Sequence, residues 1–147
     1  MKIIIDADAC PVTRIAEKIA RNFLCECILV CDNAHVMTSD YSTVITVDKG
    51  ADSADYKIVN MLSSGDIIVT QDYGLAAMCI SRGAHAINQN GMIYSDDNID
   101  GLLFFRAASA KARRAGKHLK GPKKRTAEQD IAFEKAFTDL IKTIREL

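Results

Sequence analysis

Short apolar runs alternate along this chain with stretches of helical periodicity, and this alternation constrains the fold more than any other feature. The apolar runs are KIIID (2–6), CECILVC (25–31), STVITV (42–47), DIIVT (66–70) and AHAIN (84–88). The first run has no polar alternation, which indicates a strand buried on both faces, as in a parallel sheet. The pattern predicts a three-layer α/β/α fold with a central, mainly parallel sheet of about five strands.

Helical spacing of apolar residues fills the intervals between these runs and the C-terminal part of the chain. Helices are predicted within 10–23, 52–65, 72–83, 98–116 and 126–147. Pro11 suits the first turn of the first helix, and Gly65 suits the end of the second. The segment QNGMIY contains an Asn-Gly turn that favours a small hairpin. Phe104 and Phe105 are expected to lie in the core.

Length and composition favour one domain over residues 1–147, since 147 residues suffice for one core and fall short of two ordinary ones. No apolar run approaches the length of a membrane span, and the N-terminus lacks the pattern of a signal peptide, so we expect a cytoplasmic protein without a membrane partner. The five cysteines are expected to be free thiols. The oligomeric state stays open, a homodimer included.

Acidic residues follow the predicted strands at one edge of the sheet. Asp6 and Asp8 end the first run, and Asp72 follows the fourth, with Thr70 and Gln71 beside it. Ligands of open parallel sheets bind beyond the carboxyl ends of the strands, so these acids converge if the first and fourth strands are neighbours. Asp52 and Asp55 begin a helix on the same rim. Asp66 precedes its strand and is expected at the opposite edge, as a turn residue.

Several carboxylates close together repel one another unless a cation offsets their charge. Oxygen ligands suit a hard ion, so Mg²⁺ or Mn²⁺ is the predicted cofactor. Such an ion can position a phosphodiester and lower the pKa of an attacking water. The competing interpretation is structural, because Asp8 and Asp52 also stand where helix-capping residues are expected.

Four segments together resemble one family: IIIDADACPVT, GADSADYKIVN, GDIIVTQDYGLA and GPKKRTAEQDIAF. They are similar to the YaiI/YqxD family of small bacterial proteins, which looks like a relative of the PIN-domain nucleases. This resemblance implies an acidic site that binds Mg²⁺ or Mn²⁺ through Asp6, Asp55 and Asp72 and cleaves RNA. Many PIN domains have glutamate where this chain has Asp55. PIN domains also commonly have a fourth acidic residue in the site, and in this chain that residue would be Asp8, Asp52 or Asp97.

The charge of the chain is distributed unevenly. Residues 1–100 contain 14 acidic and 7 basic side chains, whereas 101–125 contain 9 basic and no acidic ones. The basic residues are Arg106, Lys111, Arg113, Arg114, Lys117, Lys120, Lys123, Lys124 and Arg125. Such a segment can neutralise the phosphates of a nucleic acid, and RNA is the predicted partner. The segment 106–125 is expected to be partly mobile; the alternative is a solvated helix face followed by a loop.

Two other functions compete with a nuclease. Phosphatases of the haloacid-dehalogenase type begin with a strand and D-x-D, which would make Asp6 a nucleophile. They also need a lysine, and the sequence has none between Thr70 and Asp96. The other rival is a PIN-like module that binds RNA or a protein without catalysis. We favour a metal-dependent phosphodiesterase in which Asp8 is a further ligand or orients the attacking water, and Thr70 supports the site.

Overall fold

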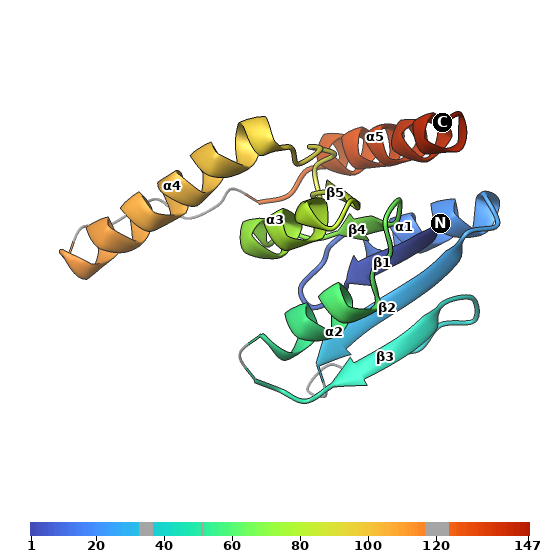
Figure 1. The fold of residues 1–147 in the computed structure, drawn as a ribbon, viewed down its shortest axis with the longest axis horizontal. Helices are drawn as coiled ribbons and strands as arrows, with labels where there is room; N and C mark the ends of the chain where they lie inside the picture. Colours follow the sequence, from blue (N-terminus) through green and yellow to red (C-terminus); the bar gives the residue numbers. More distant parts are fainter. Residues whose placement is uncertain (33–36, 51, 117–123) are drawn as a thin grey trace.

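The computed structural model describes residues 1–32, 37–50, 52–116 and 124–147. A five-stranded sheet lies at its centre, with strand order β3-β2-β1-β4-β5 and every neighbouring pair parallel. The strands are β1 (Lys2–Asp6), β2 (Glu26–Asp32), β3 (Thr43–Val47), β4 (Ile67–Val69) and β5 (His85–Ile87). Five helices flank the sheet, which confirms the predicted three-layer α/β/α fold (Figure 1).

The helices follow the predicted intervals with shorter bounds. They are α1 (Thr13–Asn22), α2 (Ser53–Met61), α3 (Tyr73–Ser81), α4 (Asp96–Arg114) and α5 (Ala127–Arg145). Pro11 precedes α1 instead of lying in its first turn, because the N-cap position falls at Val12. Gly65 does not end α2 either. It lies in the turn before β4 with φ of 88°, a conformation that glycine adopts without strain.

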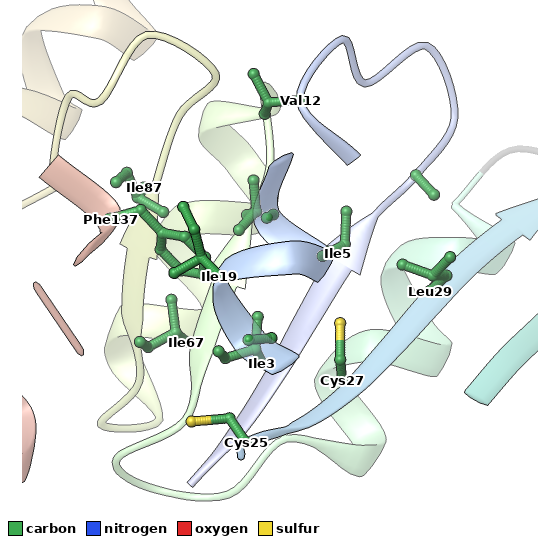
Figure 2. Close-up of a cluster of buried hydrophobic side chains, with 14 of the residues drawn as sticks. Ile3, Ile5, Val12, Ile19, Cys25, Cys27, Leu29, Ile67, Ile87 and Phe137 are labelled. Atoms are coloured by element: carbon green, nitrogen blue, oxygen red, sulfur yellow. The ribbon is translucent and has the colours of Figure 1, made fainter. Parts of the chain in front are cut away.

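One face of the sheet packs against α1 and α5. Ile3 and Ile5 of β1 point to this face together with Ile67 of β4, and Phe133 and Phe137 of α5 cover them. Figure 2 shows this cluster, in which Cys25 and Cys27 lie beside the isoleucines. Each of the five cysteines is a free thiol and four are buried, so the described part of the chain uses them as small apolar residues.

The opposite face packs against α2, α3 and the start of α4. Ile4 of β1 and Ile68 of β4 point to this face, because successive residues of a strand alternate between the two sides. Ile58 of α2, Leu75 of α3 and Ile99 of α4 cover them. Both faces of β1 are therefore buried, which explains why its sequence shows no polar alternation.

The predicted hairpin is present after β5. Ile87 and Ile93 form an isolated antiparallel bridge, and Asn88 Oδ1 accepts hydrogen bonds from the backbone N–H groups of Asn90 and Met92. Gly91 has φ of 90°, and a Cβ there would lie 2.7 Å from the carbonyl oxygen of Ala132 in α5. The turn therefore sits tightly against α5 and needs glycine at this position.

Helix α4 departs most from the expectation. Phe104 and Phe105 are 77% and 68% exposed, so their assignment to the core was wrong. Only Ile99 of α4 is buried, and Figure 1 shows the rest of the helix extending away from the sheet. Phe104 and Phe105 lie beyond the part of α4 whose apolar side chains pack on the body, namely Ile99 and Leu102, so no other element of the described chain covers them. None of the helices within the described ranges is long and apolar enough to cross a membrane.

Candidate acidic site at the carboxyl edge of the sheet

The direction in which the sheet is built up reverses between β1 and β4. From β1 the chain adds β2 and then β3 on one side, whereas β4 and β5 lie on the other. Such a switch point opens a crevice at the carboxyl ends of the strands. Asp6 ends β1, and Asp72 is the N-cap residue of α3, which follows β4. The topology therefore brings Asp6 and Asp72 to the same crevice.

Thr70 joins these two acids. Its hydroxyl donates a hydrogen bond of 2.9 Å to Asp6 Oδ2 and accepts one of 3.0 Å from the backbone N–H of Asp72. The Thr70 side chain is buried, and its carbonyl oxygen accepts a hydrogen bond of 3.1 Å from the Tyr94 hydroxyl. Thr70 is thus a positioning residue that fixes the carboxylate of Asp6 relative to the loop carrying Asp72.

Asp72 has two contacts of different kinds. Its Oδ1 accepts hydrogen bonds from the backbone N–H groups of Gly74 and Leu75, at 2.8 and 3.2 Å, which caps α3. The Arg106 guanidinium of α4 lies 3.6 Å from the same oxygen. Both side chains are more than a third exposed, so this ion pair is a weak and separable contact.

The electrostatics of the site oppose full ionisation. Burial, together with the charges of Asp55, Asp8 and Asp72, raises the pKa of Asp6 to about 6, although the hydrogen bond from Thr70 lowers it. The pKa of Asp55 is also raised, first by burial and then by Asp72 and Asp52. At neutral pH the carboxylates are held in a cluster whose repulsion a cation would relieve.

The structure decides against helix capping by Asp8 and Asp52. Both oxygens of Asp8 accept from the backbone N–H of Asp32, at 3.2 and 2.9 Å, which joins the ends of β1 and β2. The alternative that Asp8 caps the first helix does not hold, because the N-cap position of α1 falls at Val12. Asp52 occupies the N-cap position of α2, yet its side chain makes no capping hydrogen bond and its φ is 66°.

Two adjoining cavities open at the acids. The central cavity, of about 470 Å³, is lined by Asp6, Asp8, Ala9, Gln71, Asp72, Tyr73 and Arg106. The second cavity, of about 400 Å³, is lined by Asp52, Asp55, Tyr56, Asp72, Gly74, Leu75, Met78 and Arg106. Asp72 and Arg106 line both, so a ligand spanning the two would pass between a carboxylate and a guanidinium. Asp97 lines neither and is exposed in the first turn of α4.

The basic residues separate into distinct groups. Arg106 lies at the acids, whereas Lys111, Arg113 and Arg114 are exposed in the last turns of α4. Lys117, Lys120 and Lys123 lie outside the described residues. Lys124 is exposed, and Arg125 donates hydrogen bonds to Asp130, Asn90 and the Gln89 carbonyl.

Two tyrosines in the cavity walls, Tyr56 and Tyr73, were not predicted from the sequence, because nothing in their local pattern distinguishes them from packing residues.

The donor set fits a hard divalent ion only in part. Within the described ranges, no three histidine, cysteine, aspartate or glutamate side chains gather closely enough to hold a metal ion. Mg²⁺, however, usually takes one or two carboxylates and retains several waters, which matches a cavity shared by Asp6 and Asp72. Carboxylates are also the hard ligands that Mg²⁺ and Mn²⁺ prefer. The residues present therefore fit a partly hydrated ion.

Fold and site together define an α/β protein with an acidic cluster at the switch point of a parallel sheet. The chain belongs to the YaiI/YqxD family, since the family model described as "Uncharacterized BCR, YaiI/YqxD family" matches residues 4–143. A UPF0178 protein of Ruminiclostridium cellulolyticum is 53% identical over 97% of this chain and 93% of its own length. UPF0178 proteins of Clostridium novyi and Clostridium acetobutylicum are 51% and 48% identical, over 99% and 96% of this chain and 98% and 97% of theirs. No solved structure matches the chain.

Proposed function

We propose that this protein is a metal-dependent phosphodiesterase of PIN-like type that acts on RNA. The observation that carries the proposal is the convergence of Asp6 and Asp72, joined through Thr70, in one open cavity that also contains Arg106. Catalytic sites are where carboxylates with raised pKa values are held close together in a cleft, and Asp6 fits that description. The cavity is open, as a polymeric substrate requires.

The residues in and around the central cavity would have different roles in the reaction. Asp6 and Asp72 would hold the divalent ion, while Asp55, in the wall of the second cavity, would add its negative charge without a direct bond to the ion. When bound, the ion supplies charge neutralisation at the phosphodiester and lowers the pKa of the attacking water. Arg106 binds a non-bridging phosphate oxygen, because a guanidinium pairs well with phosphate. Asp8 orients the water, and Thr70 holds Asp6 in place. No lysine is among the described residues that line this cavity, which disfavours phosphatase chemistry through an aspartyl-phosphate.

The direct test is cleavage of labelled single-stranded RNA by the purified protein in Mn²⁺. We expect cleavage by the wild type and a loss of at least about a hundredfold in Asp6→Asn, because one ligand and its charge are removed. Asp97→Asn is the matched control, since this exposed aspartate lies outside both cavities. Equal cleavage by the wild type and Asp6→Asn would show that a contaminant acts, and would reject the proposal.

A second candidate function is favoured by α4. Phe104 and Phe105 are exposed on the same helix as Lys111, Arg113 and Arg114, a combination that suits a binding surface without catalysis. In this alternative the protein binds RNA or another protein and the acids have no catalytic role. Isothermal titration with Mn²⁺ separates the two. Binding that Asp6→Asn and Asp72→Asn abolish favours the phosphodiesterase, whereas no binding at millimolar Mn²⁺ favours the binding module.

A further inference from the structure

A third cavity adjoins the central one. It has a volume of about 350 Å³ and shares Ala9 and Gln71 with the central cavity. Its wall carries four side-chain amides and one guanidinium, from Gln71, Gln89, Asn90, Gln129 and Arg125. We call it the amide cavity. No carboxylate is among its described lining residues, so it differs chemically from both acidic cavities.

The wall of the amide cavity is held rigidly. Arg125 donates three hydrogen bonds of 2.7 Å, to Asp130 Oδ1, Asn90 Oδ1 and the carbonyl oxygen of Gln89. Its side chain is only 23% exposed. The turn that carries Gln89 and Asn90 is fixed in addition by the two hydrogen bonds to Asn88 Oδ1 and by the tight contact of Gly91 with α5. The backbone of this turn and the Asn90 side chain are therefore positioned before any ligand arrives.

These amides retain hydrogen-bonding capacity that the fold does not use. Gln89 Oε1 is buried and has no hydrogen-bond partner among the described residues. Asn90 is exposed; its Oδ1 accepts from Arg125, which leaves the Nδ2 donor available to a ligand. Buried polar atoms are normally satisfied, so an unpaired one adjoining a cavity indicates a missing partner.

We propose that the amide cavity is a subsite that reads the base of a nucleotide next to the phosphate held at Asp6 and Asp72. This inference rests on the proposed function, since it assigns a further part of the same RNA substrate. Side-chain amides present a donor and an acceptor side by side, which is the pattern of a nucleobase edge. Unpaired bases of single-stranded RNA expose those edges for such contacts. Arg125 lies beside the base and orients Asn90.

Binding of short RNA without divalent metal tests the subsite separately from cleavage. The probes are fluorescent eight-nucleotide strands of adenosine, cytidine or uridine, titrated with protein in the presence of a chelator. We expect the wild type to prefer one of them by about fivefold or more, as amide contacts to a base edge would give. The double variant Gln89→Ala/Asn90→Ala should bind all three within about twofold of one another.

The matched control is Asn60→Ala, which removes an exposed amide of α2 that lines none of these cavities. It should keep the wild-type preference. Asn90→Asp is a second variant: it keeps the oxygen that accepts from Arg125 and replaces the Nδ2 donor with a negatively charged carboxylate oxygen. It should weaken the binding of every strand and also lose the preference. RNA binding by the wild type without any preference, or a preference that survives in both variants, would overturn the subsite while leaving the phosphodiesterase intact. Failure of the wild type to bind any strand in chelator would also overturn the subsite, whereas the phosphodiesterase is tested independently by cleavage in Mn²⁺.

Discussion

At the scale of single residues, Asp6 carries a charge that the surrounding structure opposes. Burial and the neighbouring charges of Asp55, Asp8 and Asp72 raise its pKa to about 6. Its hydrogen bond from Thr70 offsets this only in part. A side chain held in an unfavourable state by the fold is typical of a functional site, where stability is given up for chemistry.

The first prediction concerns the effect of Asp6 on folding. Because the pKa of Asp6 is higher in the folded protein than in the unfolded chain, its contribution to stability falls as pH rises from about 4 to 6 and is then constant. Asp6→Asn should therefore raise the free energy of unfolding at pH 7 by about 1–3 kcal/mol in chelator. Urea denaturation of both proteins between pH 4 and 8 measures this.

Divalent metal should reverse the order of stability of the wild type and Asp6→Asn. Millimolar Mn²⁺ is expected to stabilise the wild type and to have little effect on Asp6→Asn, because an ion that binds only the folded state shifts the unfolding equilibrium. Equal stabilisation of both proteins would contradict a role for Asp6 as a ligand.

Asp66→Asn provides a contrast to Asp6→Asn in the same denaturation experiment. Hydrogen bonds from Lys2 and Ser63 outweigh burial and lower the pKa of Asp66 at the opposite edge of the sheet, so this variant should lose stability at pH 7.

At the scale of elements, α3 depends on the residue proposed to hold the ion. Asp72 Oδ1 caps the helix through Gly74 and Leu75, so the cap and the proposed ligand function would share one carboxylate. We predict that Asp72→Ala lowers the free energy of unfolding by about 1 kcal/mol, whereas Asp72→Ser retains most of it because serine is also a good N-cap. Both variants should lose Mn²⁺ binding. Retention of binding in Asp72→Ser would show that Asp72 is a cap alone. Chemical denaturation and isothermal titration give the two readouts.

Helix α4 supplies the second prediction at this scale. Phe104 and Phe105 are exposed, so Phe104→Ser/Phe105→Ser should change the free energy of unfolding by less than about 0.5 kcal/mol per site. Ile99→Ala, at the buried start of the same helix, should cost about 2–4 kcal/mol. A loss of several kcal/mol in the double serine variant would mean that these rings are buried in solution, by the body of the protein or by a second copy of the chain. Denaturation at several protein concentrations distinguishes those two cases.

At the scale of the whole molecule, charge is segregated. The sheet and its first three helices carry the acidic excess, whereas the last turns of α4 carry Lys111, Arg113 and Arg114 beyond the acids. A polyanion attracted by this basic end would be guided toward Arg106 and away from the rest of the acidic body. The net charge of zero conceals this arrangement.

The salt dependence of RNA binding tests that arrangement. Each phosphate contact to a single strand contributes about 0.7 to the slope of log K against log salt. Arg113→Gln/Arg114→Gln should therefore reduce the magnitude of the slope by about 1.4, as measured by fluorescence anisotropy at several salt concentrations. Lys18→Gln/Lys135→Gln removes the same charge from exposed positions on α1 and α5 and should leave the slope unchanged. Equal slopes for all three proteins would exclude α4 as the contact surface.

The sequence by itself determined the order of the elements and the edge at which the acids lie. Apolar runs such as KIIID fix strands through local periodicity, and parallel strands place their following residues at one edge whatever the strand order. Asp6 and Asp72 could be assigned to that edge, and Asp66 to the other, because these positions depend only on direction along a strand. The segments that resemble the family were also recognisable from the sequence, because each of them is continuous in the chain.

Only the tertiary structure decided which side chains meet. That β1 pairs with β4, that Thr70 bridges Asp6 and Asp72, and that Asp8 binds the end of β2 all depend on contacts between residues far apart in the chain. The exposure of Phe104 and Phe105 was equally hidden, because hydrophobicity predicts burial only where another element is present to cover the residue. The amide cavity is likewise assembled from four segments whose residues carry no local signature.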